Sequence, residues 1–250
     1  MTAHLTRAYA IGDVHGHLGE LARAHRRIRA DRERTGDAGA PVVHLGDLVD
    51  RGPESAEVIE FLLMGLAAGE PWVTLRGNHD AMFLLFLLAP QAHDPGLRED
   101  LGWLDRRIGG ARTLASYGVQ AEGRRDLAEV AAEARARVPE GHREFLEALP
   151  LWLETPDAIF VHAGIRPGIP LAQQTPEDLT WIRKGFLDSR ADHGRLVVHG
   201  HTVVDAPEHR GNRVDIDTGA GYGRPLTAVV VEGRDVWVLS DEGRQYLPPP

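Results

Sequence analysis

The sequence predicts an α/β fold, and two observations support this prediction. In the first half of the 250-residue chain, an apolar strand-like run, a glycine-containing loop and a helix-like segment follow one another three times. After Pro156, short apolar strand-like runs return. Strands separated by helices of this length pair in parallel through right-handed crossovers. We therefore expect a parallel sheet from the first half and further strands from the second.

The three strand–loop–helix units of the first half predict three strands and three helices. We expect strands at residues 8–11, 42–45 and 72–75. The helices that follow them are expected at residues 18–30, 54–67 and 81–88. Pro53 stands where the second helix begins, a favoured place for proline because the first helical turn leaves its N–H groups without intrahelical partners.

The pattern changes between residues 89 and 150, where the strand signal disappears. Residues 126–138 and 142–149 have the periodicity of amphipathic helices. We expect a helical insertion here, within a single domain that spans residues 1–250. Later strands are expected at residues 158–161, 196–198, 214–216, 227–231 and 235–239. The last two flank a three-residue connection and should pair as an antiparallel hairpin.

The composition narrows the classes of function. The formal net charge of −9 disfavours a protein that grips a nucleic-acid backbone, which would usually be basic. The chain has no cysteine, so a metal must be held by His, Asp, Glu or Asn. No run reaches the roughly 18–20 apolar residues of a membrane span, and the N-terminal MTAHLTRAY shows no secretory signal. We expect a cytoplasmic protein with neither a membrane nor a nucleic acid as partner.

Metal-binding and acid–base side chains follow five of the expected strands. They are Asp13 and His15, Asp47 with Asp50 and Arg51, Asn78 with His79, His162, and His201. Loops beyond the carboxyl ends of parallel strands converge on one crevice, so these distant residues can meet. Asp, His and Asn suit Mn, Fe, Zn or Co better than an all-oxygen calcium site. Two such ions need a bridging carboxylate and make hydroxide available near neutral pH.

Taken in order, the segments GDVHG, GDLVDRG, GNHD, HAG and GHT resemble the signature of the phosphoprotein phosphatase (PPP) family of metallophosphoesterases. The resemblance runs from Gly12 to about His201, and five ordered motifs are specific where one alone would be weak. It implies the calcineurin-like fold, a β-sandwich flanked by helices, with the helical insertion between the third and fourth motifs. Asp80 and the HAG form of the fourth motif point to the bacterial branch and put no metal ligand in doubt.

The resemblance also implies a role for each motif residue. Asp13 and His15 would hold one divalent metal ion, and Asp47 would bridge it to a second. The second ion would be completed by Asn78, His162 and His201. We expect two Mn(II) ions, with Fe, Zn, Co or Ni as alternatives.

The remaining motif residues would act on the substrate. His79 would be the general acid, oriented by Asp50. Arg51 would bind the substrate phosphate, because a planar guanidinium matches phosphate geometry. Arg183, in the segment LTWIRKGF, is our candidate for a second phosphate-binding arginine. Whether His17 or His199 contributes to the site stays open.

The implied reaction is hydrolysis of a phosphate monoester by a water or hydroxide between two metal ions. We expect a serine/threonine-type protein phosphatase acting on a phosphorylated protein or peptide, or on a small phosphoester. The alternative is a symmetrical dinucleoside-polyphosphate hydrolase of the diadenosine-tetraphosphatase type, which is similar in length and motif order. Its second motif reads GDLVARG, so Asp50 favours the phosphatase. A scaffold without catalysis is disfavoured because every ligand and acid–base position is present.

Overall fold

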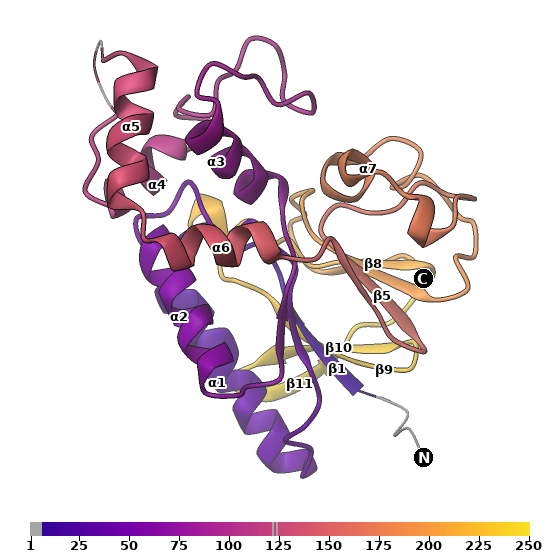
Figure 1. Ribbon diagram of the computed structural model, residues 1–250. Helices are drawn as coiled ribbons and strands as arrows, with labels where there is room; N and C mark the ends of the chain where they lie inside the picture. Colours follow the sequence, from indigo (N-terminus) through magenta and orange to yellow (C-terminus); the bar gives the residue numbers. More distant parts are fainter. Residues whose placement is uncertain (1–6, 122, 124) are drawn as a thin grey trace.

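The computed structural model describes residues 7–121, 123 and 125–250, and it contains two β-sheets (Figure 1). The six-stranded sheet has the spatial order β11 (Gly243–Tyr246), β10 (Asp235–Ser240), β9 (Ala228–Glu232), β1 (Arg7–Ile11), β2 (Val42–His44), β3 (Trp72–Thr74). The five-stranded sheet has the order β4 (Trp152–Glu154), β5 (Ala158–Val161), β6 (Leu196–His199), β8 (Arg213–Asp215), β7 (Glu208–His209). The predicted α/β class and sandwich are confirmed.

Strand pairing also follows the expectation from the sequence. β1, β2 and β3 pair in parallel, as crossovers through helices require. β9 and β10 form the expected antiparallel hairpin, and β9 then joins β1 antiparallel. In the second sheet β5, β6 and β8 are parallel. Each sheet therefore has a block of parallel strands whose carboxyl ends can carry site residues.

Alternation along the strands divides the apolar residues between separate cores. On β1, Ala8 and Ala10 face the second sheet, whereas Tyr9 and Ile11 face the helices. The core between the sheets is completed by Val43, Leu45, Phe160, Leu196, Val198, Val214, Val229 and Val231. A third cluster, on the outer face of the second sheet, packs Phe186 against that sheet.

Helices cover the outer faces of both sheets (Figure 1). They are α1 (Leu18–Thr35), α2 (Ser55–Ala67), α3 (Asn78–Leu88), α4 (Gly110–Ser116), α5 (Leu127–Arg137), α6 (Glu140–Ala148) and α7 (Pro176–Trp181). α4, α5 and α6 lie in segment 89–150 and pack against α2 and α3. That this segment is an insertion in one domain stays a prediction. No helix within the described ranges is long and apolar enough to cross a membrane.

Helix ends differ from the expected bounds for local reasons. α3 begins at Asn78 because the Asp80 carboxylate accepts a 2.8 Å hydrogen bond from the Gly77 N–H, which caps the first turn. α1 runs to Thr35 and ends at Gly36, whose φ of 69° suits glycine. The short elements α4, α7, β4, β7 and β11 escaped the sequence analysis.

Candidate active site

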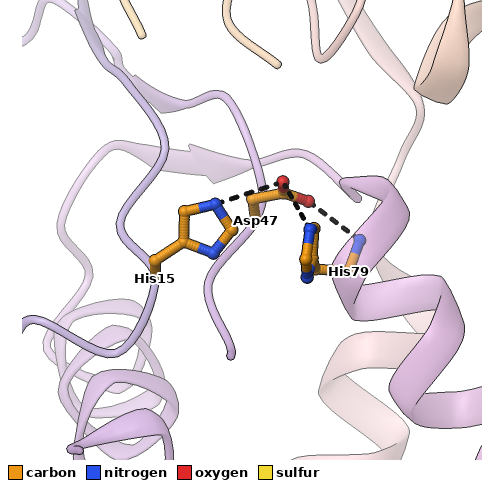
Figure 2. Close-up of side chains that lie close together, drawn as sticks. All are labelled: His15, Asp47 and His79. Carbon is orange, nitrogen blue, oxygen red and sulfur yellow. Dashed lines mark hydrogen bonds and ion pairs between the residues drawn. The ribbon is translucent and has the colours of Figure 1, made fainter. Parts of the chain in front are cut away.

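The carboxylate of Asp47 lies at the centre of a buried group of histidines (Figure 2). Its Oδ2 is 3.5 Å from His15 Nε2 and 4.0 Å from His79 Nε2. Its Oδ1 is 3.4 Å from His162 Nε2. Ligand atoms of Asp47, His162 and His201 form one group within 4.8 Å of one another, and those of His15, Asp47 and His79 form another. Asp47 therefore belongs to two adjoining groups, as a bridging ligand must.

Asn78 and Asp13, the other two expected ligands, lie next to this group. Asn78 Oδ1 lies 2.9 Å from His162 Nε2. Asp13 Oδ2 accepts a 3.0 Å hydrogen bond from the backbone N–H of His201. The six residues follow the carboxyl ends of β1, β2 and β3 in one sheet and of β5 and β6 in the other. The site thus lies where the parallel blocks of both sheets end.

The donor atoms fit metal ions. His162 Nδ1 donates to the Leu45 carbonyl at 2.9 Å, and His15 Nδ1 donates to the Val49 carbonyl at 2.9 Å. The lone pair of His162 Nε2 therefore faces the oxygens of Asp47 and Asn78, whereas that of His15 Nε2, also near Asp47, accepts from Arg51. Acceptors that face acceptors repel one another unless a cation lies between them. Among the described residues, Asp13 Oδ1 and His201 Nε2 are also buried without a hydrogen-bond partner.

Electrostatics favour the same conclusion. Burial, with Asp217 and Asp47 close by, raises the pKa of the Asp13 carboxyl well above its usual value. Burial also lowers the pKa of His15 and of His201 well below the usual value, so both rings are neutral at pH 7. Neutral imidazoles are the form that binds metals, and bound cations would relieve the repulsion between the carboxylates.

Backbone strain is concentrated at this site. Within the described ranges, the non-glycine residues with positive φ are His15, Asp47, Asp50, Arg51 and His201. Non-glycine residues rarely adopt this conformation, and those that do gather at functional sites. Glycines give the carboxylates room: a Cβ at Gly200 would lie 2.1 Å from Asp13 Oδ1. One at Gly77 would lie 2.1 Å from Asp47 Oδ1.

His79 and Asp50, for which an acid–base role is predicted, lie in contact. His79 Nδ1 lies 2.6 Å from Asp50 Oδ2, and both side chains are buried. Two residues that the sequence analysis missed hold the carboxylate. Trp103 Nε1 donates to Asp50 Oδ2 at 2.9 Å, and Thr113 Oγ1 donates to Asp50 Oδ1 at 2.6 Å. Asp50 therefore has a fixed orientation.

Both predicted arginines line the same cleft, which has a volume of about 300 Å³. Arg51 donates from Nη1 to His15 Nε2 at 2.7 Å and from Nη2 to His79 Nε2 at 3.1 Å. Its guanidinium carbon lies 4.7 Å from the ring centre of Tyr222. Burial lowers the pKa of Arg183, which shares the cleft with Asp47. Arg98 lines the cleft as well, so three guanidinium groups border it.

The remaining polar residues show where sequence reasoning was incomplete. Asp217 follows β8 just as Asp13 follows β1, so the strand-end rule could have found it. His199 packs its ring against Phe186, with centroids 5.1 Å apart, on the outer face of the second sheet. His17 is the N-cap residue of α1.

Comparison with known proteins assigns the family. Residues 6–219 match the family described as calcineurin-like phosphoesterase. The chain belongs to this family. The resemblance found in the sequence is thereby confirmed, and the protein is a metallophosphoesterase whose family uses a dinuclear metal centre.

Two curated relatives cover nearly the whole chain. A protein from Anoxybacillus flavithermus, named bis(5'-nucleosyl)-tetraphosphatase (asymmetrical), is 26% identical over 240 residues, which is 88% of each chain. One from Nitrosospira multiformis, named bis(5'-nucleosyl)-tetraphosphatase, symmetrical, is 26% identical over 275 residues, covering 92% of this chain and 94% of the relative.

Solved structures support the fold. One, proposed to be a diadenosine tetraphosphatase, has a TM-score of 0.64 at 19% identity and covers 96% of this chain and 95% of its own. The cold-active protein-tyrosine phosphatase of a Shewanella species has a TM-score of 0.61 at 17% identity, covering 97% and 80% respectively.

Proposed function

We propose that this protein hydrolyses the phosphoanhydride chain of dinucleoside polyphosphates. The observation that carries the proposal is similarity over 88% or more of the chain to relatives named bis(5'-nucleosyl)-tetraphosphatases. The preference for a protein phosphatase rested on Asp50 alone, and the relatives favour the alternative substrate class. Asp50 acts on His79 and does not face the part of a substrate that distinguishes a peptide from a nucleotide.

We further propose the asymmetrical mode of cleavage, which divides a dinucleoside tetraphosphate into a nucleoside triphosphate and a nucleoside monophosphate. The second motif expected for the symmetrical type has alanine where this chain has Asp50. The relatives from Anoxybacillus flavithermus and Bacillus subtilis carry the asymmetrical name.

Each site residue then has a task. Asp13 and His15 would hold one cation, Asn78, His162 and His201 the other, and Asp47 would bind both. When bound, two divalent cations supply positive charge and lower the pKa of a nearby water. The identity of the metal, expected to be Mn(II), stays a prediction.

The remaining residues act on the polyphosphate. Arg51 and Arg183 clamp phosphoryl oxygens and stabilise the charge that develops on them. His79 is held through Nδ1 by Asp50, and its Nε2, which accepts from Arg51 in this structure, would transfer a proton to the leaving oxygen once it is protonated and Arg51 binds the substrate instead. A leaving phosphate has a pKa of roughly 6, so it needs this proton less than a serine alkoxide does.

Substrate competition tests the proposal. The purified protein with Mn(II) is assayed on diadenosine tetraphosphate, on a phosphoserine peptide and on p-nitrophenyl phosphate, and nucleotide products are separated by ion exchange. We expect kcat/KM to favour the dinucleotide over the peptide by about a hundredfold, equal to roughly 2.7 kcal/mol, with ATP and AMP as products. A preference for the peptide would overturn the proposal. Two molecules of ADP would instead show symmetrical cleavage.

A further inference from the structure

A second hollow, of about 320 Å³, lies beside the active-site cleft. Its floor is formed by α3 through Met82, Leu85 and Phe86. Its walls come from segment 90–105, which includes Gln91 and Trp103. None of the metal-binding or phosphate-binding residues assigned above lines it, although Trp103, which donates to Asp50, does.

A thin partition separates the hollow from the cleft. Leu97 lines both spaces. A Cβ at Gly96 would lie 2.5 Å from the ring of Trp181, so this segment packs directly on a residue of the cleft. Burial raises the pKa of the Asp94 carboxyl, and a hydrogen bond from the Gly96 N–H opposes the rise, followed by His93, Trp181 and His79 nearby. The hollow and the cleft therefore adjoin at Leu97.

The lining of the hollow fits a nucleoside better than a phosphate. Met82, Leu85, Phe86, Leu97 and Trp103 give the hollow a largely apolar lining, which suits the faces of a flat base. The amide of exposed Gln91 provides a donor and an acceptor, the pair that reads the edge of adenine. No arginine is among the described residues that line the hollow, whereas Arg51 and Arg183 line the cleft.

We infer that this hollow binds the purine nucleoside at one end of the substrate, while the polyphosphate chain lies along Arg51 and Arg183. The inference rests on the proposed function and deepens it. Segment 90–105 would thus contribute to substrate selection, because it lines a site that binds a nucleoside and that a phosphopeptide has no group to fill.

Filling the hollow tests the inference. Leu85→Trp places a large ring into it. Leu88→Trp makes the same change three residues later on α3, at a side chain that is 83% exposed, and serves as the matched control. Rates are measured on diadenosine tetraphosphate and on inorganic tripolyphosphate, which has the same bonds but no nucleoside. Gln91→Ala, at an exposed position, is a second variant that leaves the apolar packing intact.

We expect Leu85→Trp to raise KM for the dinucleotide by roughly tenfold or more, because the new ring would occupy the space of the base. The activity of Leu85→Trp on tripolyphosphate should match that of Leu88→Trp. Gln91→Ala should also raise KM for the dinucleotide, by less, and leave the activity on tripolyphosphate unchanged. If the Leu85 variant does not fold, Gln91→Ala decides the matter alone. Equal effects on both substrates, or none, would overturn the inference. A wild-type protein inactive on the dinucleotide would overturn the proposed function itself.

Discussion

Trp103 Nε1 donates a 2.9 Å hydrogen bond to Asp50 Oδ2, the same oxygen that lies 2.6 Å from His79 Nδ1. The indole is fixed in turn, because its ring stacks on Phe83 and packs on Phe86. Segment 89–150 therefore reaches Asp50 through two side chains, Trp103 and Thr113. We assign Trp103 as a positioning residue for the His79–Asp50 pair.

Trp103→Phe should weaken that pair without removing it. Loss of an outer hydrogen bond of this kind costs about 10–100-fold in activity. Because His79 acts on the leaving group, the loss should be larger for phenyl phosphate than for p-nitrophenyl phosphate. Trp237→Phe, on β10, is the control. Equal losses on both substrates would indicate a merely structural role.

Gly200→Ala tests the close packing around Asp13. A new Cβ would lie 2.1 Å from Asp13 Oδ1, so the carboxylate must move away from the other ligands. We expect reduced metal content in the purified variant, measured by elemental analysis. Gly19→Ala is the control, because nothing lies within 4 Å of a Cβ there. Wild-type metal content in the Gly200 variant would argue against Asp13 as a ligand.

Arg183→Ala should lower kcat/KM on diadenosine tetraphosphate by roughly 10²–10³-fold, as expected for a cation that stabilises developing charge. The metal content should stay unchanged, since the guanidinium supplies no ligand atom. Steady-state kinetics with a parallel metal assay separates the two effects. An unchanged kcat/KM would mean that another arginine of the cleft binds the phosphate.

The acid stability of the fold depends on Asp31 of α1. Burial alone would raise its pKa, but hydrogen bonds from Arg244, Arg34 and Tyr9 lower it to about 2 from 3.8. A lowered pKa contributes stability above the unfolded value, and this contribution disappears as the pH falls from about 3.8 toward 2.

Asp31→Asn should therefore lower the free energy of unfolding by roughly 2 kcal/mol at pH 7. The difference from wild type should shrink as the pH falls below 4, because the wild-type carboxyl is then protonated as well. Urea unfolding between pH 2 and pH 7 measures both quantities. A difference that does not vary with pH would contradict the assigned role of the charge.

The sequence predicted the metal-binding residues because each follows a strand directly, and strand ends meet by topology. The position of three apolar runs was enough to predict that Asp13, Asp47 and Asn78 can meet, whereas their roles as metal ligands were implied by the family resemblance. Trp103 and Thr113 could not be found in this way, since they lie 53 and 63 residues from Asp50 and meet it only through the packing of helices. His201 lies in the site whereas His199 packs on Phe186, because the chain turns after β6 at His201, whose φ is 66°.

The substrate was the least predictable feature. The motifs describe the chemistry at phosphorus, which phosphomonoesters and phosphoanhydrides share. The residues that would distinguish these substrates lie outside the motifs, in segments such as 90–105. The conformation of such a segment depends on tertiary packing and has no local sequence signal. Sequence reasoning therefore identified the reaction better than the molecule on which it acts. The cytoplasmic location and the single domain stay predictions.

The proposed dinuclear metal centre depends on Asp47, which would be the residue common to both metal sites. Elemental analysis of active protein and of Asp47→Asn, both loaded with Mn(II) and freed of excess metal, tests it most directly. We expect two ions per wild-type chain and loss of both sites' affinity in the variant, together with its activity. Wild-type metal content in Asp47→Asn, or full activity in metal-free wild-type protein, would contradict it.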